Sequence, residues 1–336
     1  FTYDRPAFVK EPETTTTTAK PTTTTTATKP TTTKYTVTGT LPNARVKASK
    51  SNYDLRIKLP SGVTSYYLED KYTSRQLFMS CAGNYVSHFN NASNRYAKSS
   101  MSGFTVKYNS TKKRTYVYVK ASSSYRGYAV SFDNGYAYIK WGTPKTMYKN
   151  ILVLDAGHGG SDSGASGNGM AEKNLTLAIV LAAKRSFDKD SRFQVSYTRT
   201  SDTYPSLSQR AKLANNKNAD MFLCVHINSA SASAHGTETL WSKSRNSATQ
   251  KKGLTSKTLA TAMQSAAVAA TGFTNRGLVD RPNLYVLKHT NMPACLIEYG
   301  FISNRKESAR MKANTSAYGK ALYKAVVNLM KKQGKY

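Results

Sequence analysis

The segment ILVLDAGHGG, residues 151–160, points most directly to the fold of the second half of the chain. Its apolar start is typical of a short buried strand, and the glycines after His158 let backbone and ligand approach closely. We expect strands at 151–154, 193–197, 221–227 and 294–299, and helices at 172–187, 207–216 and 254–270. A C-terminal amphipathic helix follows, of which 317–330 is the clearest part. This alternation predicts an α/β fold, with a mainly parallel sheet flanked by helices and sites beyond the carboxyl ends of its strands.

The preceding region has a different pattern, with short alternating runs such as RTYVYVKA (114–121) and YAYIKWG (136–142). A period of two indicates strands, so we expect an N-terminal all-β domain, a small antiparallel sandwich or barrel, over residues 35–148. Fifteen of the 23 tyrosines lie there. Tyrosine suits half-exposed sheet and also stacks on sugar rings, and the sequence leaves both readings open.

The first 34 residues are dominated by threonine, with fourteen Thr among residues 14–33. Such a composition cannot bury a core, so we expect residues 1–34 to form a disordered tether. Residues 149–336 then form the C-terminal domain. The chain begins with Phe1 rather than Met, and we expect a processed or trimmed product whose targeting segment is not included.

The charge of the chain is strongly positive, with 49 Lys and Arg against 18 Asp and Glu and a net charge of +31. Its 39% of apolar residues excludes a fully disordered chain, and no apolar run reaches the roughly 18 residues of a membrane span. Lys outnumbers Arg, and Lys lacks the planar fork that reads base edges, so we expect no nucleic-acid partner. Anionic cell-wall polymers fit better; a membrane surface or a merely basic soluble surface remains open.

Four chemically active side chains stand at predicted strand ends or at a helix start: His158, Glu172, His226 and Glu298. Two His and one carboxylate form a hydrolytic zinc set that leaves one coordination position for water, and a second carboxylate takes the proton from that water. Glu298 fits the second role. Without an HExxH helix the spacing alone is weak, and structural histidines remain an alternative.

Three longer segments then match a known family in order: HGGSDSGASGNGMAEKNL (158–175), SQRAKLANNKNADMFLCVHINS (208–229) and MPACLIEYGFISN (292–304). The region from residue 150 to the end resembles the zinc-dependent N-acetylmuramoyl-L-alanine amidases of the amidase type 3 family. The segment before it loosely resembles the wall-targeting β-sandwich often found upstream of bacterial amidases.

The resemblance implies that His158, Glu172 and His226 ligate Zn²⁺ and that Glu298 is the catalytic carboxylate. It also implies cleavage of the amide between the lactyl group of N-acetylmuramic acid and L-Ala of the peptide stem in peptidoglycan. Two departures are mild: Cys224 stands where a small hydroxyl residue is common, and Ala156 where Pro is common. Neither belongs to the implied zinc ligands.

Other polar residues near these motifs have more ordinary interpretations. We expect Arg210 and Asn215 to make structural contacts between helix and strand. His235 and Glu238 either line the cleft or occupy a strand edge, and His289 is mainly structural, with contact to substrate as the alternative.

The roles of Asp155 and Asp162 remain open, and His88 is expected outside the site. Asp155 and Asp162 flank His158, and either one can orient that ligand or fix the glycine loop. His88 is expected in a loop of the β domain.

The sequence therefore favours a secreted enzyme of the bacterial cell wall, with peptidoglycan as substrate and anionic wall polymers as further partners. Two other functions remain: a wall-binding protein with a degenerate catalytic domain, and a zinc peptidase that acts elsewhere on the stem peptide.

Overall fold

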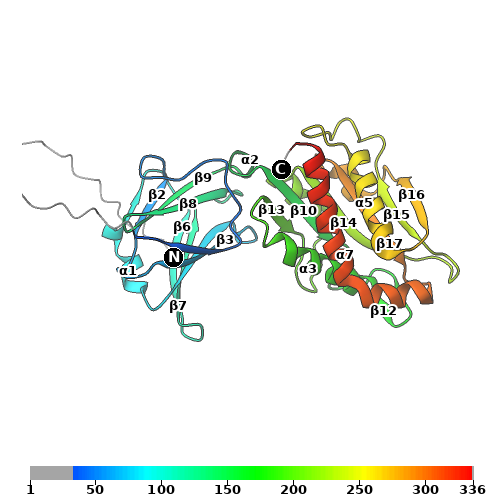
Figure 1. Cartoon of the computed structure of the whole chain (residues 1–336), viewed down its shortest axis with the longest axis horizontal. Coiled ribbons are helices and arrows are strands. Elements are labelled where there is room, and N and C mark those ends of the chain that lie inside the picture. The colour runs from blue at the N-terminus through cyan, green and yellow to red at the C-terminus, as the bar shows by residue number, and fades with distance from the viewer. Residues whose placement is uncertain (1–32, 335–336) are drawn as a thin grey trace, which may run out of the picture. The chain divides into compact units, whose positions relative to one another are not determined.

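The structure is a computed structural model that describes residues 33–334. The predicted tether falls almost entirely outside the described residues. The chain divides into two compact units between Met147 and Tyr148, so Tyr148 belongs to the second unit rather than the first (Figure 1). None of the helices in residues 33–334 combines the length and the apolar character that a membrane span needs.

The described part of the first unit contains two sheets. The five-stranded sheet has the order β1 (Thr36–Gly39), β3 (Ser65–Lys71), β4 (Gln76–Ala82), β7 (Arg114–Lys120), β6 (Gly103–Asn109). The four-stranded sheet has the order β5 (Arg95–Ala97), β2 (Leu55–Lys58), β9 (Tyr136–Gly142), β8 (Gly127–Asp133). Alternate side chains of both sheets form one buried core that includes Leu55, Leu77, Val117 and Ile139.

This unit differs from the sequence expectation in two details. Strand β1 pairs with β3 in parallel, whereas the other neighbouring strands of the unit are antiparallel. Short helical segments interrupt the strands: α1 (Val86–Asn90), the 3-10 turn η1 (Ala92–Asn94) and α2 (Pro144–Met147). His88 lies in α1 rather than in a loop, and its ring is hydrogen-bonded to the Lys58 carbonyl at 3.0 Å.

The second unit has a six-stranded sheet. Its order is β13 (Phe193–Tyr197), β10 (Asn150–Ala156), β14 (Met221–Asn228), β17 (Ala294–Phe301), β15 (Thr237–Trp241), β16 (Asn275–Asp280). Within residues 148–334, β15 and β17 pair antiparallel and the other four neighbouring pairs of this sheet are parallel. Strands β15 and β16 extend the sheet beyond what the sequence patterns predict.

Helices flank this sheet. They are α3 (Glu172–Phe187), α4 (Leu207–Lys217), α5 (Ser256–Thr271), α6 (Tyr285–His289) and α7 (Arg305–Lys332). Helix α7 packs against both α3 and α5 (Figure 1). Gly319 permits the approach to α3, because an added Cβ would lie 2.5 Å from the Ile179 carbonyl oxygen. The C-terminal helix α7 begins at Arg305, before 317–330, the part of this helix that is clearest in the sequence.

Local sequence explains where α4 begins and ends, and this helix leads directly into β14. Ser206 and Gln209 form a reciprocal capping box at the start of α4, which satisfies two free N–H groups. Asn218 ends the helix in the left-handed conformation, with φ 49°. Between β10 and α3, a small hairpin of β11 (Ser166–Gly167) and β12 (Met170–Ala171) returns the chain to the start of α3.

Candidate metal centre and active site

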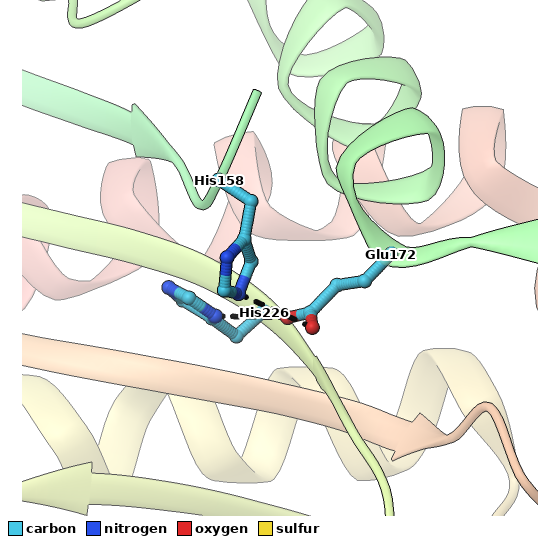
Figure 2. Close-up of side chains that lie close together, drawn as sticks. All are labelled: His158, Glu172 and His226. Atoms are coloured by element: carbon cyan, nitrogen blue, oxygen red, sulfur yellow. Dashed lines mark hydrogen bonds and ion pairs between the residues drawn. The ribbon is translucent and has the colours of Figure 1, made fainter. Parts of the chain in front are cut away.

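Three of the predicted site residues lie together where β10 and β14 end and α3 begins (Figure 2). His158, Glu172 and His226 each offer one ligand atom, and these atoms lie within 4.8 Å of one another. Glu172 Oε2 is 3.2 Å from His158 Nε2, and Glu172 Oε1 is 2.8 Å from His226 Nδ1. His158 does not close the strand as expected, because β10 ends at Ala156 and His158 belongs to the turn that follows.

A buried arginine, Arg210, stabilises the turn that carries His158. His158 is in the left-handed region with φ 60°, a conformation that costs a side-chain-bearing residue free energy. Arg210, only 2% exposed, donates to the carbonyl oxygens of His158 at 2.8 Å and Ala156 at 2.6 Å. It also pairs with Asp155 at 2.7 Å. Arg210 is therefore a structural contact that stabilises the ligand turn.

Asp155 and Asp162, which the sequence could not tell apart, have different positions. Asp162 Oδ2 is 2.8 Å from His158 Nδ1, so the other ring nitrogen, Nε2, faces Glu172. Asp162 Oδ1 also accepts the Gly164 N–H at 3.0 Å. Asp155 is fully buried. It accepts hydrogen bonds from the Arg210 guanidinium and from the Cys224 thiol, each at 2.7 Å. Asp162 is thus the carboxylate that orients His158.

Glu172 is anchored by the backbone as well as by the histidines. It is 4% exposed and accepts N–H groups from Ile227 at Oε1 and Ala165 at Oε2, both at 2.9 Å. Burial raises the pKa of this carboxyl, but hydrogen bonds from His158 and His226 outweigh burial and hold the pKa well below its usual range. Glu172 is consequently ionised at neutral pH.

Two glycines lie directly against the three side chains, where a larger residue would collide with them. A Cβ on Gly157 would lie 2.4 Å from His226 Nε2, and one on Gly164 would lie 2.6 Å from both Glu172 Oε2 and His158 Cδ2. The two imidazole rings are 4.7 Å apart between centroids and inclined by 76°. Two imidazole nitrogens and one ionised carboxylate, converging in fixed orientations, form a donor set that fits zinc.

Glu298 lies in β17, next to these residues on the same sheet. It is in register with His226 on β14 and with Glu238 on β15. Its Oε2 atom has no hydrogen-bond partner within residues 33–334. Burial raises the pKa of Glu298 well above its usual range, and the charges of Glu172 and Glu238 add to this effect. Burial therefore favours the protonated form of Glu298 more than it would for an exposed carboxyl.

The remaining candidates divide between the site edge and other surfaces. Glu238 is beside Glu298, whereas His235 is exposed and its ring is bonded to the Ser233 carbonyl at 2.9 Å. His289 lies at the end of α6, before the amino end of β17, and its ring is tilted against that of Tyr285, with 4.2 Å between the ring centres. Asn215 donates to the His289 carbonyl at 2.8 Å, so its contact is structural but joins α4 to α6 rather than to a strand. Because β17 is parallel to β14, His289 lies at the sheet edge opposite the site.

Two arginines near the site had no signal in the sequence. Arg199 is 3% exposed and donates to the carbonyl oxygens of Ala156 at 3.0 Å and Gly157 at 2.9 Å. Arg276 in β16 pairs with Glu238 at 2.6 Å. Neither stands in a recognisable motif, and their contacts depend on strand order, which spacing alone does not give.

Comparisons with known proteins agree with this geometry. Residues 152–331 match the N-acetylmuramoyl-L-alanine amidase family, type 3. An endolysin of Bacillus phage SPP1 is 40% identical over 189 residues, which cover 55% of this chain and 68% of the endolysin. The sporulation-specific N-acetylmuramoyl-L-alanine amidase of Bacillus subtilis strain 168 is 35% identical over 178 residues, covering 53% of this chain and 65% of that protein.

A solved structure is similar as well. The crystal structure of the N-acetylmuramoyl-L-alanine amidase from Clostridium difficile 630 has a TM-score of 0.50 and 32% identity, and the match covers 54% of this chain and 97% of that one. The family resemblance of the three sequence motifs is thereby confirmed. By its motifs, its matched domain and its relatives, the chain belongs to the N-acetylmuramoyl-L-alanine amidase family.

Proposed function

We propose that this chain is a zinc-dependent N-acetylmuramoyl-L-alanine amidase that cleaves the amide between the N-acetylmuramic acid lactyl group and L-Ala of the peptidoglycan stem. The observation that carries the proposal is the convergence of His158, Glu172 and His226 within 4.8 Å, with Glu298 in register beside His226. A secreted enzyme that acts in the bacterial cell wall follows from this substrate.

In this proposal His158 Nε2, His226 Nδ1 and the Glu172 carboxylate hold the zinc ion. The bound zinc supplies Lewis acidity, which polarises the scissile carbonyl and lowers the pKa of water to about 7. Asp162 keeps His158 in the required tautomer through its Nδ1 contact at 2.8 Å. The backbone N–H groups of Ala165 and Ile227 keep both Glu172 oxygens in place before substrate arrives.

Glu298 moves the proton. The half-buried Glu298 is in register with His226, which supports this carboxyl as the group that accepts a proton from the attacking water. The raised pKa of Glu298 lets the carboxyl hold that proton until the C–N bond breaks, and the proton then passes to the leaving amine of L-Ala. The products are an intact lactyl carboxylate and a free L-Ala amino terminus.

We further propose that the first unit binds the wall. Residues 33–147 carry eighteen Lys and Arg against four Asp and Glu, which suits an anionic polymer. Phe78, 7% exposed, lies on the face of the five-stranded sheet that points away from the core. The half-buried rings of Tyr118, Tyr116 and Tyr67 surround it at 5.1, 5.2 and 6.1 Å. Such an aromatic surface suits stacking on sugar rings.

Two alternatives are disfavoured by particular observations. A wall-binding protein with a degenerate catalytic domain has no need for the buried hydrogen bonds that orient His158 and Glu172. A zinc peptidase acting elsewhere on the stem would use the same metal, and it differs in its products. Mass spectrometry of muropeptides separates the two, because an amidase frees L-Ala amino termini.

The decisive experiment compares two substitutions at the site. Glu298→Gln keeps the three ligands, so the protein should bind one zinc per chain and lose turnover of peptidoglycan by roughly 10²-fold or more. His226→Ala leaves two protein ligands and should lose zinc and turnover together. Zinc content by elemental analysis and muropeptide release measure both effects. If Glu298→Gln lost zinc as readily as His226→Ala, Glu298 would be a ligand and the assignment would be wrong.

Wall binding is tested in the first unit. Tyr116→Ala and Tyr118→Ala should each weaken pelleting with insoluble walls by about 2- to 10-fold, the value of one aromatic contact. Tyr108→Ala is the matched control, because Tyr108 is 38% exposed and points to the other face of the same sheet. Equal loss in all three variants would contradict a binding role for the surface around Phe78.

A further inference from the structure

Four adjacent strands place a row of charged or ionisable side chains across the site edge of the sheet. The strands are β14, β17, β15 and β16, in that order (Figure 1). His226 of β14 is in register with Glu298 of β17, and Glu298 is in register with Glu238 of β15. Arg276 of β16 reaches Glu238 at 2.6 Å and completes the row. The first two members serve the proposed reaction, and the last two have no role in it.

Arg276 is placed by an irregularity in the pairing of β15 with β16. Thr237 is in register with Asn275 and Glu238 with Gly277, so Arg276 is the extra residue of a bulge. Gly277 accommodates the bulge with φ 78°. The guanidinium of Arg276 also lies over the Phe301 ring, 5.1 Å from its centre. Bulge and ring together direct the guanidinium over the site edge.

Glu238 is already satisfied and is no second base. Its Oε1 accepts from Asn228 Nδ2 at 3.0 Å and its Oε2 from Arg276 Nε. Glu298, by contrast, has a free Oε2 within the described residues. The function of Glu238 is thus to hold Arg276 by one side of its guanidinium.

The other side of the guanidinium remains available. Apart from Nε, Arg276 makes a long contact from Nη1 to the His235 carbonyl at 3.4 Å, and its side chain is 43% exposed. A guanidinium presents five N–H groups in a planar fork that matches a carboxylate. A fixed, half-exposed fork next to the catalytic edge is a suitable binding group for an anionic part of the substrate.

The spacing fits a carboxylate close to the scissile bond. Two strand spacings of about 4.8 Å separate the backbone of Glu298 from that of β16. An extended peptide advances about 3.3 to 3.6 Å per residue, so the residue after L-Ala lies one such step from the cleaved amide. The Arg276 side chain turns back toward Glu238, which is in register with Glu298, so its guanidinium reaches the strand next to Glu298.

We propose that Arg276 binds the α-carboxylate of the stem residue that follows L-Ala, so that the enzyme prefers an acidic stem to an amidated one. This inference rests on the proposed amidase function, because it assigns the neighbouring substrate position. Arg276 is then a specificity-determining residue, and Glu238 positions it.

The experiment uses two synthetic ligands that differ in one group: N-acetylmuramoyl-L-Ala-D-Glu and the same compound with its α-carboxylate converted to the carboxamide. Their Kd values are measured by calorimetry on the zinc-loaded full chain carrying Glu298→Gln, which prevents turnover. The acidic ligand should bind roughly 10- to 100-fold more tightly, the effect of one charge-assisted hydrogen-bond pair. Adding Arg276→Gln should bring the ratio close to one. Arg276→Lys, which keeps the charge but not the fork, should give an intermediate ratio.

Two further variants separate recognition from positioning. Arg281→Gln removes the same charge just beyond the far end of β16 and should leave the ratio unchanged. The pair Arg276→Gln with Glu238→Gln removes both charges, and the ratio should stay near one. If this pair restored the preference, Arg276 would act only by neutralising Glu238, and the proposal would be overturned. Equal binding of the two ligands by the parent protein, or no binding of the acidic one, would also overturn it.

Failure of the proposed function has a different signature. It appears as the absence of new L-Ala amino termini when the protein with its native Glu298 is incubated with intact walls. That result does not depend on Arg276.

Discussion

Replacement of Gly164 by alanine tests whether close packing fixes the proposed metal ligands. Gly164 has φ 64°, and an added Cβ would lie 2.6 Å from Glu172 Oε2 and 2.6 Å from His158 Cδ2. Gly169, in the same loop, has φ 73° and nothing within 4 Å of its added Cβ. The two positions thus impose a similar backbone strain, and they differ in whether the methyl group meets the ligands.

The expected magnitudes follow from this difference. A left-handed alanine costs about 1 to 2 kcal/mol relative to glycine, and this applies to both variants. At Gly164 the methyl group must also push Glu172 and His158 away by several tenths of an ångström or more. Disturbing groups that orient metal ligands typically costs about 10- to 100-fold in metal affinity. Gly164→Ala should therefore lose zinc affinity by at least that factor, and Gly169→Ala should keep it.

Competition with a chromogenic chelator measures zinc affinity, and thermal unfolding with excess chelator measures the backbone cost separately. Both variants should unfold at lower temperature than the parent protein without zinc. Only Gly164→Ala should need more zinc to saturate. Parent-like zinc affinity in Gly164→Ala, or an equal loss in Gly169→Ala, would refute the view that contact with this loop sets the ligand geometry.

Two other predictions concern burial and protons. Arg210→Ala leaves Asp155 buried without its cation and should lower the free energy of unfolding by about 3 to 5 kcal/mol. The control Arg185→Ala, on the exposed surface of α3, should change the free energy of unfolding by less than about 0.5 kcal/mol. Similar values for the two variants would contradict the structural role of Arg210. Burial lowers the pKa of His158, but hydrogen bonds to Glu172 and Asp162 outweigh burial and raise it above 6.5. In the metal-free protein, the protonated His158 ring therefore stabilises the folded state. This contribution is complete below the unfolded-state pKa of the histidine and is lost as the pH rises through the raised folded-state pKa. Zinc, by contrast, binds only the neutral ring. The melting temperature of the zinc-loaded protein minus that of the chelated protein should therefore increase from about pH 6 to about pH 8, and a constant difference would contradict the assignment.

Much of the second unit could be predicted because its elements are locally determined. The helix at 172–187 and the strand at 193–197 have the predicted bounds, since strong apolar periodicity coincides with clear ends. The sequence patterns do not predict strands β15 and β16. TETLW is short and NRGLVD contains Gly277 in a bulge, so their strand character depends on pairing with β17 and with each other.

The candidate site was likewise predictable only where local sequence determines the position of a residue. Residues at strand ends and at a helix start could be expected to converge, because parallel strands bring their carboxyl ends to one edge. The carboxylate that orients His158 could not be chosen, since Asp155 and Asp162 lie at similar distances in sequence. The turn after β10 decides it by directing Asp162 toward Nδ1. The pair of Glu238 and Arg276 needed both the strand order and the bulge, and neither is visible in the sequence.

The reversal of β15 relative to β17 determines where this fold can tolerate insertions. Because β15 runs against β14, the connecting segment 229–236 leaves and re-enters the sheet at the site edge. Residues near the start of α7 bind its backbone: Asn304 donates to the carbonyls of Ala232 and Ala234, each at 3.2 Å, and Glu307 accepts the Gly236 N–H at 2.7 Å. Arg276 of β16 also contacts the His235 carbonyl, at 3.4 Å. Residues inserted there would lie beside the proposed substrate site and leave the proposed metal ligands in place. Loop grafting at 229–236 therefore offers a route to amidases with altered stem preference.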